Sequence, residues 1–451
     1  MIANASVAKR RNFFAVFAAV ADDPGMSPTD QSSRNLPPTA ALAAMAGNLM
    51  EWYDFALYGV LAPTLGLLFF PGKDKLASTL AVFGVFAAGY VARLAGGAFF
   101  GYLADHSSRR KALIFSATTM ACSTALAGCL PVYDSVGILA PIAFLTLRIL
   151  QGVSTGGEFT TSVVFMVEKA PPDKRGLIGS LSGTTAGLGI LLGSAIGSAL
   201  FSFYPIETVH AWAWRIPFLL SIPLGLAVTF LRTALPPEPQ TPFHHSSHHR
   251  SSLLHVVKEH PIAVIGGALR GWGSVAGFYI VAVFLSSYLV TSGLMSPSGA
   301  LGLQTMGVAT AVLMAPVGGY LSDRFGRRTM VIVSASCVLV LAWPLFTALR
   351  SENHNLSLLL LIVFAACVGT GMAPYSTWLA EERPRFLRAS WMGVTYNIAA
   401  GILGGSTPLV AGLLIEKFHS LMAPAALLVA ASIVTIVISL FARETNRKVL
   451  N

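Results

Sequence analysis

Five ionisable side chains lie inside long apolar stretches of this 451-residue sequence, where a charge is costly unless it is paired or functional. They are Glu51, Asp54, Arg93, Arg148 and Glu158. In apolar surroundings, a carboxylate beside an arginine favours its ionised form, whereas the same group without a partner favours its protonated form. Carboxylates of this kind can therefore take up and release protons as their pairing with guanidinium groups changes.

The spacing of these residues predicts that they meet. Glu51 and Asp54 are three residues apart and share one face of a helix. Arg148, Gln151 and Glu158 fall within a helical sector of about 80°. The three carboxylates lie roughly 15–20 Å from the same end of their helices, so we expect them at similar depths in one cavity.

We assign a transferable proton to Asp54, with Arg148 or Arg93 as its counter-charge. Glu51 and Glu158 would shape the local electrostatic field. The alternative is that these groups form fixed ion pairs that lock three helices together. Only the first hypothesis requires the Asp54 carboxylate to change its protonation state.

The second half of the chain has one charge within an apolar stretch, Arg270. An unpaired guanidinium opposite an acidic half can bind a substrate carboxylate. We expect Gln151, Tyr279, Tyr396 and Asn397 to contribute to substrate binding with it. The alternative is that Arg270 extends to a membrane surface and binds no ligand.

Twelve apolar stretches must position these residues, because a membrane-spanning helix needs about 20 predominantly apolar residues. Six stretches precede a Pro- and His-rich segment and six follow it. The sequence is 54% hydrophobic and only 11% charged, whereas a soluble domain is about a quarter charged. We predict an all-α integral membrane protein with twelve transmembrane helices in two six-helix bundles.

The net charge of +10 could indicate nucleic-acid binding, but the positions of the basic residues argue otherwise. With the amino end in the cytoplasm, the outer loops hold only Lys73, Lys75, Arg215, Arg350 and Lys417. Lysine and arginine concentrate in cytoplasmic loops of membrane proteins. Both termini are therefore predicted to be cytoplasmic, and the basic charge faces the anionic lipid bilayer rather than nucleic acid.

Two motifs recur at nearly the same offset. Residues 101–105 and 319–323 match, as do residues 168–175 and 381–388. The first pair contains Asp105 and Asp323, and a basic cluster follows each copy. The candidate gating residues are these two aspartates and the arginines that follow them, Arg109, Arg110, Arg324, Arg327 and Arg328. An aspartate at a helix end beside guanidinium groups can join two loops in one state and release them in another. Such repeats indicate two pseudo-symmetric halves with a solute site between them, although the loops could instead serve only as topology anchors.

Several of these motifs resemble those of the major facilitator superfamily, whose signature loop is similar to residues 319–328 (GYLSDRFGRR). Residues 47–55 (GNLMEWYDF), 148–158 (RILQGVSTGGE) and 214–218 (WRIPF) are similar to motifs of its metabolite:proton symporter family. That family includes transporters of proline or betaine, α-ketoglutarate, citrate and shikimate. The resemblance implies proton-driven symport by alternating access, with the signature loops stabilising the outward-facing form.

The predicted organisation has a disordered or mis-started extension (1–38), two bundles (39–235 and 261–442), a cytoplasmic linker (236–260) and a cytoplasmic tail (443–451). We expect a monomeric importer in the inner membrane that is not an enzyme and has no metal or cofactor beyond the proton gradient. Its substrate would be an organic carboxylate or a zwitterionic osmolyte such as proline or betaine. The alternatives are export on the same fold, or sensing without transport.

Overall fold

The computed structural model describes residues 38–72, 75–106, 109–233, 253–351 and 353–446, and every regular element within these ranges is helical. Among the described residues, eleven helices are long and apolar enough to cross a membrane, and the shorter apolar helix Leu113–Cys129 supplies a twelfth candidate. The predicted twelve-helix membrane fold is confirmed. The extension predicted for residues 1–38 and the histidine-rich part of the predicted linker lie outside the described residues, apart from Pro38.

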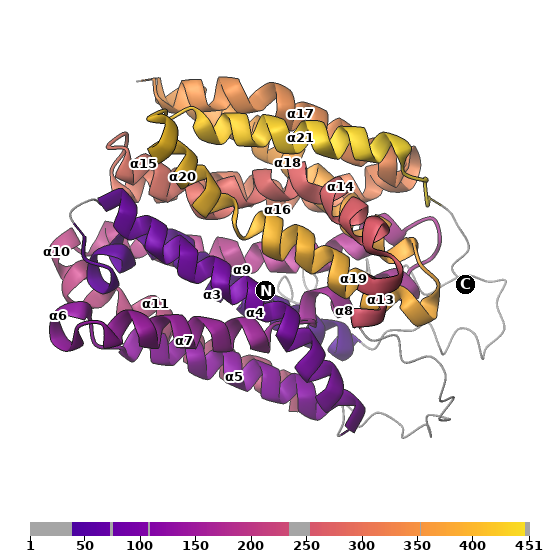
Figure 1. Cartoon of the computed structure of the whole chain (residues 1–451), viewed down its shortest axis with the longest axis horizontal. Coiled ribbons are helices and arrows are strands. Elements are labelled where there is room, and N and C mark those ends of the chain that lie inside the picture. The colour runs from indigo at the N-terminus through magenta and orange to yellow at the C-terminus, as the bar shows by residue number, and fades with distance from the viewer. Residues whose placement is uncertain (1–37, 73–74, 107–108, 234–252, 352, 447–451) are drawn as a thin grey trace, which may run out of the picture.

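The first six membrane-crossing segments are coloured indigo to magenta and form one bundle (Figure 1). Their helices are α3 (Pro38–Phe69), α4 (Lys75–His106), α5 (Arg109–Cys129), α7 (Leu139–Ser154) with α8 (Glu158–Lys169), α9 (Arg175–Phe203), and α11 (Arg215–Leu219) with α12 (Ser221–Thr233). Short connecting elements are α6 (Tyr133–Val136), α10 (Ile206–Thr208) and the π-helical segment η1 (Val209–Ala213).

The last six segments form a second bundle beside the first, coloured salmon to yellow in Figure 1. They are α14 (Pro261–Tyr279) with η2 (Ile280–Phe284) and α15 (Leu285–Thr291), α16 (Pro297–Phe325), α17 (Arg327–Leu349), α18 (His354–Glu381), α19 (Arg385–Tyr396) with η3 (Asn397–Gly404) and α20 (Thr407–Phe418), and α21 (Ala423–Phe441). The end of the predicted linker forms the helix α13 (Leu253–Glu259), whose Val256 packs in one cluster with Trp391 and Val394. This part of the linker is therefore packed against the second bundle.

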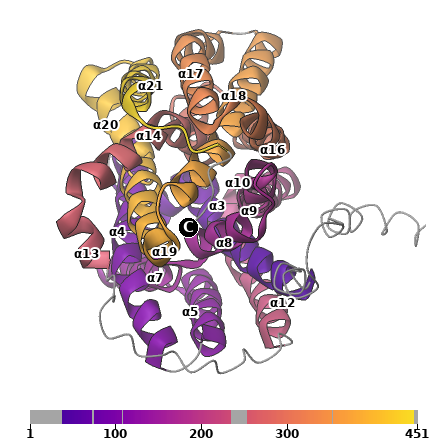
Figure 2. The ribbon, with the colours of Figure 1, turned by 90° about the vertical axis from the view of Figure 1, so that its right-hand side faces the viewer.

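The two bundles approach closely along α9 and α16, which lie side by side in Figure 2. A Cβ atom at either Gly176 or Gly319 would overlap the carbonyl oxygen of the other glycine. Farther along the same helices, a Cβ atom at Gly187 would overlap the side chain of Val312. Glycines of this kind let the backbones of membrane helices come into direct contact.

Three membrane-crossing segments are interrupted near their centres. The fourth breaks at residues 155–157, between α7 and α8, and the seventh and eleventh contain the π-helical segments η2 and η3. Irregular backbone at membrane depth is tolerated where protein surrounds it, and π-helical turns are frequent at functional sites. Each interruption adjoins a candidate site residue: Glu158 begins α8, Tyr279 ends α14 and Asn397 begins η3.

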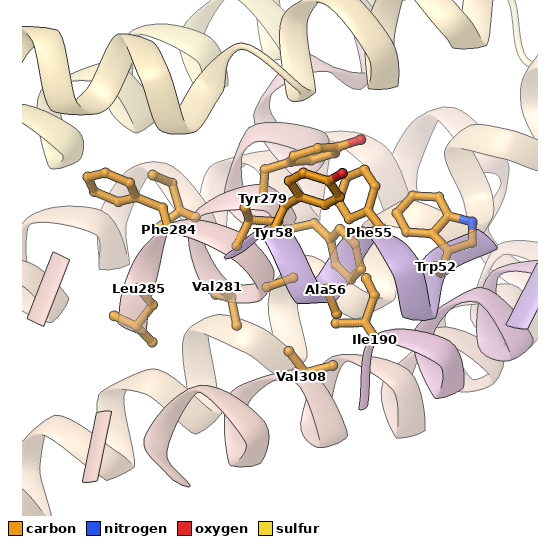
Figure 3. Packing of buried hydrophobic residues seen from close by; sticks show 14 of the residues in the cluster. Trp52, Phe55, Ala56, Tyr58, Ile190, Tyr279, Val281, Phe284, Leu285 and Val308 are labelled. Atoms are coloured by element: carbon orange, nitrogen blue, oxygen red, sulfur yellow. The ribbon is translucent and has the colours of Figure 1, made fainter. Parts of the chain in front are cut away.

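Helix α3 runs through the centre of the molecule, and its aromatic side chains pack against both bundles. Figure 3 shows Phe55 of α3 beside Tyr279 of the second bundle, and the ring of Trp52 lies with its centroid 6.1 Å from that of Phe278. The rings of Phe55 and Tyr279 are in edge contact, with centroids 5.4 Å apart. Movement of one bundle relative to the other must therefore repack α3, which also carries Glu51 and Asp54.

Candidate functional site

Asp54 accepts three hydrogen bonds in the middle of the first bundle. Its Oδ2 atom accepts one from Arg148 Nη1 at 2.9 Å, and its Oδ1 atom accepts one from Thr124 Oγ1 at 2.7 Å and one from Gln151 Nε2 at 2.8 Å. All four side chains are buried. Three donors, one of them cationic, stabilise the ionised carboxylate away from water.

Arg148 is held in place by aromatic rings as well as by the carboxylate. Its guanidinium lies 4.1 Å from the ring centroid of Tyr58 and 5.0 Å from that of Phe86. The hydroxyl of Tyr58 donates to Gln151 Oε1 at 2.8 Å, which orients the amide that donates to Asp54. The Asp54 site is thus a connected polar network enclosed by apolar groups.

A second buried ion pair joins Glu51 to Arg93. Within the described structure, no other side chain or backbone group donates a hydrogen bond to Glu51, so its carboxylate has one partner where Asp54 has three. Both pairs line a cavity of about 20 Å³, together with Gln151. This volume holds about one water molecule, through which a proton could pass between the two carboxylates.

Glu158 does not line that cavity. It forms an ion pair with Arg232 of α12, whose Nη1 atom also donates to the carbonyl oxygen of Leu113 at 2.6 Å. Gly47 leaves room for the pair, because a Cβ atom there would overlap both charged groups. The helix break at residues 155–157 changes the register between Arg148 and Glu158. Spacing along one continuous helix had placed Glu158 on the same face as Arg148 and Gln151, and that prediction is wrong for Glu158.

Arg232 was missed by the sequence analysis. A basic residue at the end of an apolar stretch usually marks the cytoplasmic end of a membrane helix. The one signal in the sequence for a buried role of Arg232 is that the Glu158 carboxylate, inside an apolar stretch, needs a cationic partner. In the structure, Arg232 is 2% exposed, which excludes a solvated loop position.

The expected unpaired state of Arg270 is wrong. Its Nη2 atom donates to Glu382 at 2.7 and 2.9 Å, and its guanidinium lies 4.5 Å from the ring centroid of Trp378. Glu382 directly follows α18, and no spacing in the sequence indicates that it pairs with Arg270. Arg270 therefore contributes to closing one end of the second bundle.

In the described structure, the other expected substrate-binding residues contact groups other than Arg270. The Tyr279 hydroxyl donates to the hydroxyl of Tyr90 at 2.8 Å, and the Tyr396 ring stacks on Phe159 with centroids 4.7 Å apart. Asn397 donates to the carbonyl oxygen of Gly156, in the broken fourth segment, at 3.3 Å. These three residues contact the first bundle, whereas Gln151 belongs to the Asp54 network.

Asp323 joins the two bundles at one end of the molecule, which we call the gate end. Its carboxylate accepts hydrogen bonds from the backbone N–H groups of Gly176 and Leu177, at the start of α9, at 2.8 and 2.9 Å. Arg327 pairs with Asp323 at 2.7 Å and with Glu381 at 3.0 Å. A carboxylate at a helix N-terminus is stabilised by the backbone donors and the helix dipole.

The remaining candidate gating residues have different positions. Arg324 lies over the ring of Tyr320, and the Arg328 backbone N–H donates to Glu444. A second link between the bundles, from Arg388 to Glu168 at 2.6 Å, belongs to the repeated 168–175 and 381–388 motifs. The side chains of the first-half candidates, Asp105, Arg109 and Arg110, lie outside the described part of the structure.

Residues 443–446, which we call the strap, fold back onto the gate end. Glu444 accepts hydrogen bonds from the backbone N–H groups of Arg327 and Arg328, and Thr445 Oγ1 donates to Glu381 at 2.7 Å. The side-chain amide of Asn446 donates to the carbonyl oxygen of Asp323 at 3.3 Å. The described part of the predicted tail is therefore attached to the gating residues.

A cavity of about 350 Å³ lies between the bundles at the opposite end. Its lining includes Thr64 and Lys75 of the first bundle and Ser287 of the second. His210 also lines it, and burial lowers the pKa of that imidazole against the opposing effect of Glu207. Next to this cavity, the backbones of Gly59 in the first bundle and Val283 in the second are in close contact.

Comparison with known proteins identifies the family. The sequence profile of the Major Facilitator Superfamily matches residues 44–406 and 269–450. The chain belongs to this superfamily. It is 31% identical to the glycine betaine/proline/ectoine/pipecolic acid transporter of Dickeya dadantii, over 91% of this chain and 84% of that protein. It is 30% identical to the shikimate transporter of Escherichia coli, over 90% of this chain and 95% of that protein.

The fold is similar to that of the xylose transporter of Escherichia coli, with a TM-score of 0.73 and 18% sequence identity. The match covers 91% of this chain and 99% of the xylose transporter. The family resemblance in the sequence is thus confirmed, and this member of the superfamily is a multi-pass membrane transporter rather than an enzyme.

Proposed function

We propose that this transporter is a proton-coupled symporter that imports a small polar solute across the inner membrane. The solute would be an organic carboxylate or a zwitterionic osmolyte, as the names of the relatives suggest. One observation carries the proposal of proton coupling: Asp54 is buried at the centre of the first bundle with Arg148 as its only cationic partner among the described residues.

Proton coupling follows if the Asp54–Arg148 pair opens in part of the transport cycle. A paired Asp54 stays ionised, whereas an unpaired Asp54 in the same apolar surroundings binds a proton. Thr124 suits both states, because its hydroxyl can donate either to Asp54 or to the carbonyl oxygen of Met120, at 2.9 Å. When it donates to Met120, its oxygen can accept the proton of a neutral Asp54 carboxyl group.

Alternating access would use the gate end. We place this end and both termini in the cytoplasm, because the lysines and arginines concentrate in the loops on that side. The contacts of Asp323 with α9 and of Arg388 with Glu168 then close the cytoplasmic side, while the 350 Å³ cavity faces the outside. Opening the gate end would require these contacts to break and the outer cavity to close.

The decisive experiment replaces the proposed proton carrier with a neutral residue of the same shape. In right-side-out vesicles, Asp54→Asn should lose accumulation driven by an acid-outside gradient but keep solute counterflow. Asp134→Asn provides a matched control, because Asp134 is an exposed aspartate on the short helix α6. Unchanged gradient-driven accumulation by Asp54→Asn would refute the assignment.

A further inference from the structure

A small chamber lies between the two bundles and is separate from the Asp54 cavity. Its volume is about 40 Å³, room for about three water molecules, and its walls come from α3, α8 and α9 on one side and α14, α16, α18 and α19 on the other. Val312, in its wall, is near the middle of the 29-residue helix α16, which places the chamber at mid-depth.

Four aromatic side chains from both bundles line this chamber: Trp52, Phe159, Phe278 and Tyr396. The Trp52 ring centroid is 5.9 Å from that of Phe159 and 6.1 Å from that of Phe278. The lining includes no charged residue. Aromatic faces attract cations, and several rings around one space are a known arrangement for recognising quaternary ammonium groups.

The Trp52 side chain also lacks a hydrogen-bond partner. It is 2% exposed, and its indole N–H has no acceptor among the described residues. Figure 3 shows its nitrogen on the side of the ring that faces away from Phe55. A buried donor without an acceptor is unfavourable, and a carboxylate bound beside the ring would satisfy it.

The arginines of the Asp54 cavity argue against a ligand with several carboxylates. Arg93 and Arg148 each already pair with a buried carboxylate of the protein. Displacing such a pair to bind a citrate-like anion would leave a protein carboxylate buried without a partner, which is strongly unfavourable. A ligand whose own positive and negative charges cancel avoids this cost.

We propose that the chamber binds a compact zwitterion, with its substituted ammonium group against the four rings and its carboxylate on the indole N–H of Trp52. The assignment rests on the proposed function, because it names the substrate class and its site. Gly183 leaves open space at one wall of the chamber, since a Cβ atom there would meet nothing within 4 Å, and the chamber has to widen beyond its present 40 Å³ when the solute binds.

The binding test uses the purified full-length protein and three probes. Glycine betaine has the ammonium and the carboxylate, 3,3-dimethylbutyrate has the same shape without the positive charge, and citrate has carboxylates alone. Isothermal titration should show glycine betaine binding about tenfold or more tightly than 3,3-dimethylbutyrate, since cation–π attraction in a desolvated site has that magnitude. No binding of glycine betaine, or equal or tighter binding of either anion, overturns the proposal.

Two substitutions locate the site. Trp52→Phe keeps an aromatic face but removes the N–H donor, and should weaken glycine betaine binding about tenfold or more while leaving weak tetramethylammonium binding unchanged. Gly183→Leu should fill the chamber and abolish binding of both. Gly84→Leu is its control, because Gly84 also has open space at its Cβ position but lies in α4, outside the chamber lining. Full binding by both Trp52→Phe and Gly183→Leu would refute the site.

The outcome separates this inference from the proposed function. If glycine betaine fails to bind, but uptake of another solute depends on the proton gradient and on Asp54, only the chamber assignment fails. If glycine betaine binds as expected and Asp54→Asn still accumulates it, proton coupling through Asp54 fails and the chamber assignment stands.

Discussion

The two bundles share one fold but place their charges differently. The first bundle keeps two ion pairs, Asp54–Arg148 and Glu51–Arg93, around a cavity in its centre. The ion pairs of the second bundle lie at the gate end, where Arg270 and Arg327 meet the carboxylates at the end of α18. Its centre contributes apolar and aromatic side chains, such as Tyr279 and Tyr396.

This difference suggests a division of tasks between related halves. Charges in the centre can change partners and protonation state as the surroundings open, whereas charges at a helix end mainly join loops. We infer that the first bundle carries the coupling chemistry, and that the second supplies gating contacts and half of the solute chamber. Substitutions of equivalent type in the two bundles should therefore have unequal effects.

The largest effect is expected for Arg148→Ala. It leaves Asp54 buried without its cation, and breaking a buried pair in this way costs about 3–5 kcal/mol. Thermal unfolding in detergent should show a marked loss of stability, and accumulation should be absent. The double variant Arg148→Ala with Asp54→Asn should recover most of the stability but no accumulation. If the Arg148→Ala variant is as stable as the parent, breaking the Asp54–Arg148 pair does not carry the expected loss of unfolding free energy.

Gly47→Ala should have the next largest effect. The added methyl group overlaps the Glu158–Arg232 pair, and overpacking at a rigid site costs about 1–3 kcal/mol. Gly84→Ala is the matched control, because its Cβ atom enters open space. The difference between the unfolding temperatures of Gly47→Ala and Gly84→Ala measures the free energy needed to displace the Glu158–Arg232 pair. Equal temperatures would show that this pair moves at little cost.

Arg270→Ala is expected to cost less, about 1–2 kcal/mol, because Glu382 is 26% exposed and can be solvated after its partner is removed. Solute affinity, measured by isothermal titration, should stay within about twofold of the parent, since Arg270 acts at the gate end. A large loss of affinity for carboxylate solutes would restore Arg270 as a substrate receptor and contradict the contrast between the bundles.

Thr124→Val should give the smallest effect. It preserves the side-chain shape and removes one of three donors to Asp54, for which about 1 kcal/mol is typical. Gradient-driven uptake should fall a few-fold, whereas counterflow should change little. A loss as complete as that of Asp54→Asn would mean that the hydroxyl is an obligatory part of the proton path.

The sequence predicted the twelve helices and the family because both depend on long apolar stretches and local motifs. It also indicated that Asp54 and Arg148 could meet, since they are opposite charges inside apolar stretches, where a charge needs a partner. It could not place Glu158, because the break at residues 155–157 changes the helical register and turns the carboxylate toward Arg232. Nor could it assign Asp323 to the backbone N–H groups of α9, because such donors exist in every helix and leave no sequence signal.

The strap sets an order of events during biosynthesis. Asp323, Arg327 and Glu381 are all translated before residues 443–446, so their arrangement stays incomplete until the final membrane segment has been made. A ribosome-bound chain that has not yet produced Glu444 would lack the acceptor for the first N–H groups of α17. The newly inserted protein would thus acquire its fully closed gate end only after residues 443–446 have been made.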